Sequence, residues 1–152
     1  MNRRFAMNAL GLATLAACVR TAGAAEHDHH HMHGAGGAAA CPMGRYKALV
    51  AATSDCVAQG QACLAHCLRL LSEGDRSLGA CASSVNQVLP LCTALQALAG
   101  QESALTPKLA RVVLEACTEC ADACKPHVDH HAECKACYES CMECIKQCQA
   151  VV

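Results

Sequence analysis

The sequence predicts an all-α fold, an antiparallel up-down-up-down four-helix bundle with a cysteine-lined core. After residue 44, cysteines and aliphatic residues recur at alternating spacings of three and four, and no segment alternates with the two-residue period of a strand. Gly74, Gly100 and Pro126 interrupt this pattern at intervals that suit four helices joined by short connections. The 152 residues include 15 cysteines but only three aromatic side chains, so sulfur must occupy positions that large rings usually fill.

Residues 1–25 have the features of an export signal rather than of the fold. An Arg-Arg-Phe sequence at 3–5 precedes a weakly apolar run, and Ala-Gly-Ala at 22–24 offers a cleavage site, as in twin-arginine signals. Leu-Ala-Ala-Cys at 15–18 also resembles a lipoprotein box, in which Cys18 would carry the lipid. We therefore expect an exported, periplasmic protein that is either released or anchored to the membrane through Cys18.

Residues 26–43 form a separate histidine-rich leader before the bundle predicted at 44–152. Five histidines and one methionine between Glu26 and His33 could collect Cu(II), Zn(II) or Cu(I), or the segment could be a solvated leader without a specific task. Cys41 and Met43 lie outside the repeating pattern, and we expect at most a peripheral role in metal binding for them.

The first two helices are bounded by turn residues. We predict the first helix over residues 45–73, because the helical pattern stops there at Gly74. Asp75 is the expected N-cap of a second helix over residues 76–99. Pro90 lies inside this second stretch and should kink it, because proline removes a backbone donor and its ring clashes with the preceding turn.

The third and fourth helices have their own start signals. Thr106 followed by Pro107 combines an N-cap residue with proline at the first helical position, and predicts a helix that runs to about residue 125. Asp129 is the expected cap of the fourth helix, which continues to about residue 150.

The cysteines fall on one face of each predicted helix. In the fourth helix five cysteines follow spacings of 3, 4, 3 and 4, and the other helices continue this pattern with cysteine, valine and leucine. Such an alternation is the seam of a helix bundle, the stripe that faces its centre. Thirteen cysteines lie on the seam: Cys56, Cys63, Cys67, Cys81, Cys92, Cys117, Cys120, Cys124, Cys134, Cys137, Cys141, Cys144 and Cys148.

Metal ligation explains this seam better than structure alone. Free cysteine can act as a small hydrophobe, but thirteen of them would pack a thin core. Disulfides between helices are conceivable, although side chains three or four residues apart on one helix have poor geometry for a bridge, and thirteen is an odd number. Soft thiolates repeated at intervals of about 5–6 Å suit metal ions.

The choice of metal follows from coordination number. Zinc prefers separate tetrahedral sets of four ligands, and we do not expect a continuous helical seam to converge four thiolates repeatedly. Iron–sulfur clusters need loops that wrap the cluster, whereas the Cys-x₂-Cys-x₃-Cys run ending at Cys124 lies within a predicted helix. Cu(I) is soft and is satisfied by two or three thiolates, so doubly bridging sulfurs would hold roughly one Cu(I) per core cysteine.

The seam and the export signal together resemble the bacterial copper storage proteins, over residues 44–152 and most closely their twin-arginine-exported branch. The resemblance implies a four-helix bundle that holds many Cu(I) ions on core thiolates, supplies copper enzymes or copper chaperones, and assembles as a homotetramer. The histidine-rich leader is not part of the shared motif. The motif is carried by four Cys-x₃-Cys steps along the seam: Cys63/Cys67, Cys120/Cys124, Cys137/Cys141 and Cys144/Cys148.

One end of the predicted bundle is the expected copper entrance. The connections after the first and third helices share an end, which brings seam cysteines beside His127, His130 and His131. These histidines could pass Cu(I) inward, with His127 and His131 as peripheral ligands, or could simply cap a helix end and solvate a turn. His66 is interpreted as a flanking residue. The opposite end is expected to be closed by four apolar residues: Leu49, Leu95, Leu109 and Val113.

Charge and motif content exclude several other classes. Lys and Arg number 12 against 13 Asp and Glu without a basic stripe, which argues against nucleic-acid binding. The sequence contains no run of about 20 apolar residues, so it predicts no membrane span. No Ser-His-Asp set, phosphate loop or carboxylate pair on a common face indicates an enzyme. A zinc or mixed-metal thiolate buffer and a disulfide-stapled helical protein remain as alternatives to copper storage.

Overall fold

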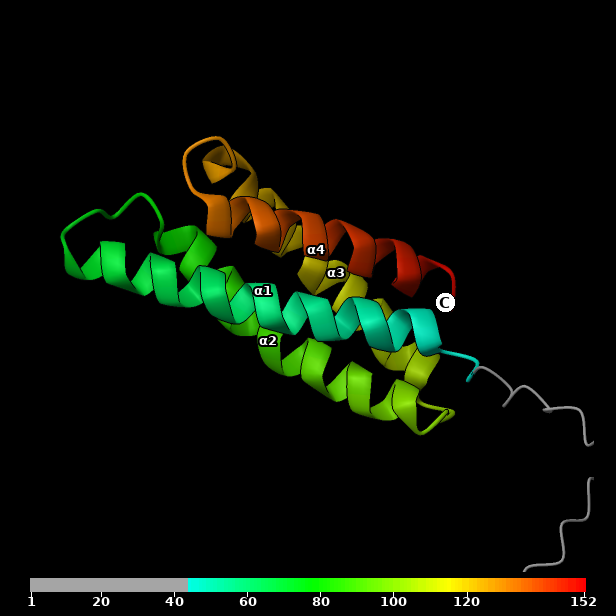
Figure 1. The fold of residues 1–152 in the computed structure, drawn as a ribbon. Coiled ribbons are helices and arrows are strands. Elements are labelled where there is room, and N and C mark those ends of the chain that lie inside the picture. The colour runs from blue at the N-terminus through cyan, green and yellow to red at the C-terminus, as the bar shows by residue number, and fades with distance from the viewer. Residues whose placement is uncertain (1–43) are drawn as a thin grey trace, which may run out of the picture. The chain divides into compact units, whose positions relative to one another are not determined.

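The computed structural model describes residues 44–152, and within them the fold is an all-α four-helix bundle, as predicted (Figure 1). Helices that are consecutive along the chain pack side by side, and α1 also packs against α4, which closes the ring. The elements are α1 (Lys47–Ser72), α2 (Gly79–Gly100), α3 (Thr106–Cys124), the 3₁₀ turn η1 (Lys125–His127) and α4 (Ala132–Gln149). The predicted signal and leader, with Cys18, Cys41 and Met43, lie outside the described residues.

The turn between α1 and α2 differs in detail from the prediction. Gly74 ends the first helix as expected, with φ of 98°, a conformation that favours glycine. Asp75 does not cap α2, which begins four residues later at Gly79. Its carboxylate instead accepts a hydrogen bond from the backbone N–H of Ser77 at 2.9 Å, which stabilises the turn itself. Pro90 lies inside α2, which continues from Gly79 to Gly100, and the kink expected there stays a prediction.

The starts of α3 and α4 also lack the expected side-chain caps. Thr106 is the first residue of α3, with Pro107 in the first turn, but the buried Thr106 hydroxyl has no hydrogen-bond partner. Asp129 lies before α4, whose N-cap is His131 in an extended conformation. Pro126 sits within η1, so the chain continues from α3 into a tighter turn before the connection to α4.

A contact between loops ties the start of α1 to the α2–α3 connection. Glu102 has φ of 52°, which is rare for a residue other than glycine. Its carboxylate accepts a hydrogen bond from the backbone N–H of Arg45 at 2.9 Å. The acid therefore satisfies a donor at the beginning of the bundle, which helps to offset the cost of the strained backbone.

The core is built from small side chains. Apart from cysteine, the largest fully buried side chains are leucines, valines and threonines, and Tyr46 is the one buried aromatic residue within 44–152. Gly60 lies where α1 meets α2, and a Cβ atom placed there would come 3.0 Å from Leu89 Cδ2. None of the helices in the described part is long and apolar enough to cross a bilayer.

Candidate metal centre

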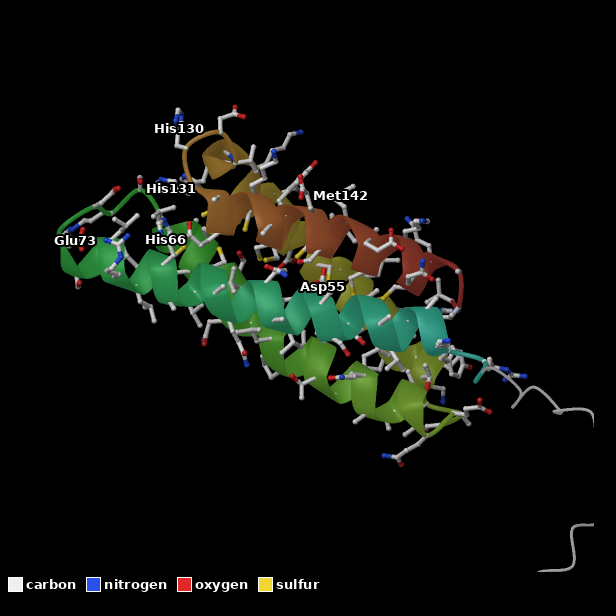
Figure 2. The ribbon with its side chains drawn as sticks, in the orientation of Figure 1. Asp55, His66, Glu73, His130, His131 and Met142 are labelled. Atoms are coloured by element: carbon white, nitrogen blue, oxygen red, sulfur yellow. The ribbon has the colours of Figure 1, made fainter. Side chains whose placement is uncertain are left out.

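All thirteen seam cysteines point into the bundle and are buried as free thiols. No seam side chain exposes more than 1% of its surface. The seam forms because α-helical periodicity places residues three and four apart on one stripe, and each of the four helices turns that stripe inward (Figure 2). The structure thus brings every predicted seam ligand into one core.

A first group of four thiols lies toward the end where α1 turns into α2, and we call it the histidine-end group. It consists of Cys63 and Cys67 from α1, Cys81 from α2 and Cys134 from α4. The sulfur of Cys63 lies 3.9 Å from that of Cys67, 3.7 Å from that of Cys81 and 3.8 Å from that of Cys134. The sulfurs of Cys67 and Cys81 are 3.7 Å apart. Four thiols from three helices therefore surround one point.

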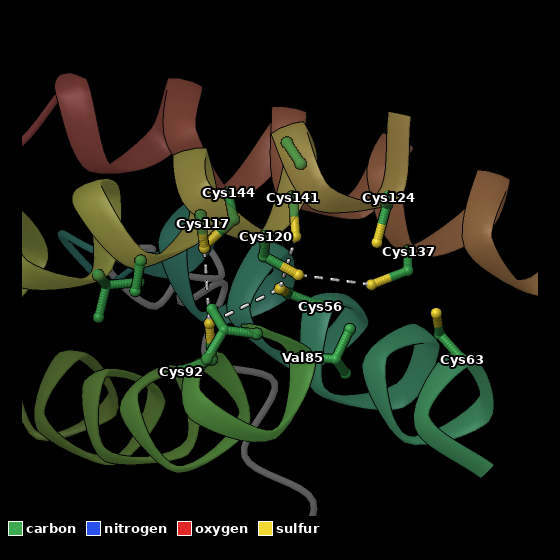
Figure 3. Close-up of a cluster of buried hydrophobic side chains, with 14 of the residues drawn as sticks. Cys56, Cys63, Val85, Cys92, Cys117, Cys120, Cys124, Cys137, Cys141 and Cys144 are labelled. Carbon is green, nitrogen blue, oxygen red and sulfur yellow. Dashed lines mark hydrogen bonds between the residues drawn. The ribbon is translucent and has the colours of Figure 1, made fainter. Parts of the chain in front are cut away.

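A second group of four thiols, the mid-bundle group, takes one cysteine from each helix. Its members are Cys56, Cys92, Cys117 and Cys144, and their sulfurs all lie within 4.8 Å of one another. The sulfur of Cys92 lies 3.6 Å from that of Cys56 and 3.8 Å from that of Cys117 (Figure 3). We expected that a helical seam would not bring four thiolates together repeatedly, and this is wrong. Two groups of four exist, because neighbouring helices place cysteines at the same level along the bundle axis.

The two groups belong to a continuous array of sulfur. The sulfurs of Cys56 and Cys141 are 3.9 Å apart, and those of Cys81 and Cys124 are 3.2 Å apart. Cys148 is buried but belongs to none of the groups. Two trios bridge the groups of four: Cys63, Cys124 and Cys137, and Cys120, Cys137 and Cys141.

Burial and neighbouring thiols shift the pKa values of these cysteines in opposite directions. Burial raises the pKa of Cys67 and of Cys134 above the ordinary value of 9.0, because a thiolate would lose its hydration there. Hydrogen bonds from the thiols of Cys117 and Cys141 lower the pKa of Cys56. A thiolate formed at Cys56 is thus stabilised by its neighbours, whereas burial keeps the thiols of Cys67 and Cys134 protonated to higher pH.

Histidines cover the end of the array at the histidine-end group. His66 Nε2 lies 3.0 Å from His131 Nδ1, and His66 Nδ1 lies 3.4 Å from a carboxylate oxygen of Glu133. The rings of His127 and His131 have centroids 6.2 Å apart, whereas His130 is exposed. The structure thus adds His66, which the sequence analysis set aside as a flanking residue, to this histidine cluster (Figure 2).

The opposite end of the array is closed by apolar side chains. Leu49, Leu95 and Val113 are buried, as expected, and Leu109 is half-buried beside them. Tyr46, which the sequence analysis did not place, is also buried at this level of the bundle. The array therefore has a histidine cluster at one end and mainly apolar side chains at the other.

Three carboxylates line one groove on the surface. The groove, of about 240 Å³, is lined by Asp55 on α1 and by Glu139, Ser140 and Glu143 on α4. These acids do not form a close ligand set. Among residues 44–152, the groups of three or more potential ligand atoms that lie close enough to share an ion consist of cysteines.

Comparison with known families agrees with this geometry. The family model described as "Csp: Copper storage protein" matches residues 42–152. The matched region includes the whole bundle and all thirteen buried cysteines. No curated protein matches the chain.

Proposed function

The chain belongs to the copper storage protein family, and on that premise we propose that it stores Cu(I) on its core thiolates and supplies the copper to copper enzymes or copper chaperones. The observation that carries this proposal is the continuity of the array. Twelve buried sulfurs fall into groups that share members or lie in contact, so ions at neighbouring positions would share ligands.

Cu(I) suits the array because of its softness and its low coordination number. Cysteine thiolates favour soft metal ions such as Cu(I) and zinc, and of these two Cu(I) is the one for which pairs or trios of sulfur suffice. The two trios and the linking contact between Cys56 and Cys141 offer too few thiols for separate tetrahedral ions. Shared thiolates would carry roughly one Cu(I) per core cysteine.

The same proposal includes the route by which copper enters the bundle, the compartment in which the protein lies and its oligomeric state. Copper enters at the histidine end, where His127 and His131 act as peripheral ligands in front of Cys134, and leaves by the same route. The export signal sends the protein to the periplasm, and Cys18 anchors it to the membrane if that residue is lipidated. Cys41 and Met43 are further peripheral ligands, and the bundle assembles as a homotetramer.

Copper counting on the reduced chain tests the proposal. Cu(I) is added without oxygen in the presence of a competing chelator, and the expected capacity is about 13 ions per chain, one for each seam thiolate. A capacity near one or two would overturn the storage function. Thiols that are unavailable before chemical reduction would instead support the disulfide-stapled alternative.

A further inference from the structure

The histidine-end group and the mid-bundle group share no cysteine, so both can hold an ion at once. A zinc ion with four thiolates has Zn–S bonds of about 2.3 Å, which places its sulfurs about 3.8 Å apart at the corners of a tetrahedron. Within the histidine-end group four of the six sulfur separations are 3.7, 3.7, 3.8 and 3.9 Å, and the two between Cys134 and the sulfurs of Cys67 and Cys81 are within 4.8 Å. Four of the six sulfur separations are therefore close to the edge length of a zinc tetrathiolate.

The mid-bundle group also has sulfur separations near those of a tetrahedron, but its four ligands come from four different helices. Two of its sulfur separations, 3.6 and 3.8 Å, are also close to a tetrahedral edge, and all six are within 4.8 Å. One ligand from each helix gives a radial arrangement in which a central ion would contact all four helices. Such an ion would hold the bundle together from the inside.

We propose that each of these groups binds one divalent d¹⁰ ion, so that the copper-free chain holds two zinc ions. Its physiological meaning, a store kept folded until copper arrives, rests on the proposed copper function. Each binding event converts thiols to thiolates, and one proton leaves for each thiol that ionises. The metal keeps its oxidation state throughout.

The thiols that lie outside the two groups limit the number of zinc ions to two. Five seam thiols lie outside both groups, and no four of them lie within 4.8 Å of one another; the set that does is the trio Cys120, Cys137 and Cys141. All three are fully buried, so water has no open route to the fourth position of a tetrahedron. A third zinc ion should therefore bind far more weakly than the first two.

Charge favours replacement of zinc by copper over the reverse exchange. Four thiolates around one divalent ion leave negative charge uncompensated in a core where charges are poorly solvated. One Cu(I) per thiolate balances that charge, and copper is also the softer ion. Copper should therefore displace zinc from both groups, and zinc should not displace copper.

Co(II) is the probe for the test, because tetrahedral cobalt tetrathiolate absorbs strongly through sulfur-to-metal charge transfer. The histidines of residues 27–33 do not contribute to that band, so it counts thiolate sites in the full reduced chain. We expect the band to saturate at two Co(II) per chain, to vanish when zinc is added, and to vanish again when Cu(I) is added to a fresh sample. Saturation at one or at three ions, or a band that survives excess Cu(I), would overturn the inference.

Three matched serine variants locate the two sites. Cys134→Ser removes a ligand of the histidine-end group, and Cys144→Ser removes one of the mid-bundle group. Each should halve the cobalt band, and the double variant should lose it. Cys148→Ser, on the same helix but outside both groups, should leave the band unchanged. A Cys148→Ser variant that loses half the band, or a Cys134→Ser variant that keeps it all, would refute the assignment.

Copper capacity measured on the same variants separates this inference from the storage proposal. If the cobalt sites are absent but each variant still binds nearly the full load of Cu(I), only the zinc inference fails. If the chain takes two divalent ions and no more than a few Cu(I), the storage proposal fails while the two sites stand. Helical circular dichroism confirms that each variant is folded before either metal is counted.

Discussion

His66 on α1 and His131 at the start of α4 are hydrogen-bonded to each other through their ring nitrogens, 3.0 Å apart. His66 comes directly before Cys67, and His131 comes three residues before Cys134. Both cysteines belong to the histidine-end group. The imidazole pair therefore covers one end of the sulfur array, while leucine and valine close the other.

The first prediction concerns the rate of copper loading. The double variant His66→Ala/His131→Ala should load Cu(I) about tenfold more slowly, because it lacks the imidazoles that exchange copper with the first thiolates. Its final capacity should be unchanged, since no seam cysteine is altered. Stopped-flow mixing with a Cu(I)–chelator complex measures the rate. His130→Ala, on the same connection but exposed, is the control, and equal rates in both variants would exclude this entrance.

The second prediction concerns alkaline pH. Burial raises the pKa of Cys67 and Cys134 above 9.0 in the folded chain, whereas in the unfolded chain both thiols ionise near that value. The folded state therefore holds these protons at a pH where the unfolded state has lost them. Their contribution to stability is complete below about pH 9 and is lost as the pH rises toward the folded pKa values.

Urea unfolding of the reduced, metal-free chain at a series of pH values measures this effect. The free energy of unfolding should fall as the pH rises above about 9. The decline should be shallower in Cys67→Ser/Cys134→Ser, because serine does not ionise in this range. Stability that rises with pH in the wild-type chain, or an identical slope in the double variant, would contradict the assignment.

The third prediction concerns the effect of copper on stability. The described core contains one buried aromatic residue, Tyr46, so the metal-free bundle has few large side chains to stabilise it. An ion that binds the folded state at 100 times its dissociation constant adds about 2.7 kcal/mol, and several ions bind. Saturation with Cu(I) should therefore raise the melting temperature by more than about 10 °C. Equal melting curves with and without copper would show that copper does not bind in the core.

Most of the fold could be predicted from the sequence because helix packing depends on periodicity. The 3,4 spacing determines which side of each helix is buried, and the structure buries all thirteen seam cysteines. Gly74 has the positive φ that a glycine stop implies. The caps were predicted less well. Asp75 stabilises its own turn through Ser77, and Asp129 lies before the first turn of α4, where His131 takes the N-cap position.

The grouping of the thiols could not be predicted from spacing alone. Which sulfurs meet depends on how far each helix is shifted along the bundle axis relative to its neighbours, and loop geometry sets that shift. The contact of Cys92 with both Cys56 and Cys117 is an example, since it joins three helices. His66 was set aside for the same reason: its partners, His131 and Glu133, lie on a helix far away in sequence.

The last prediction concerns how the copper load is distributed along the array. Cys120 and Cys141 belong to a trio that links neighbouring groups, so their loss removes one shared ligand and leaves the other thiols free to pair again. Serine is similar in size to cysteine, and the helices should remain intact. Cys120→Ser and Cys141→Ser should each lower the Cu(I) capacity by about one ion, and Cys41→Ser, off the seam, should change it little. Counting copper by atomic absorption after gel filtration measures all three, with circular dichroism as the check on folding. A distributed store gives such small, separate losses, because neighbouring ions share thiolates and the remaining thiolates can pair again. A single dominant site would behave differently, and loss of the whole load in any one folded seam variant would rule out the storage proposal.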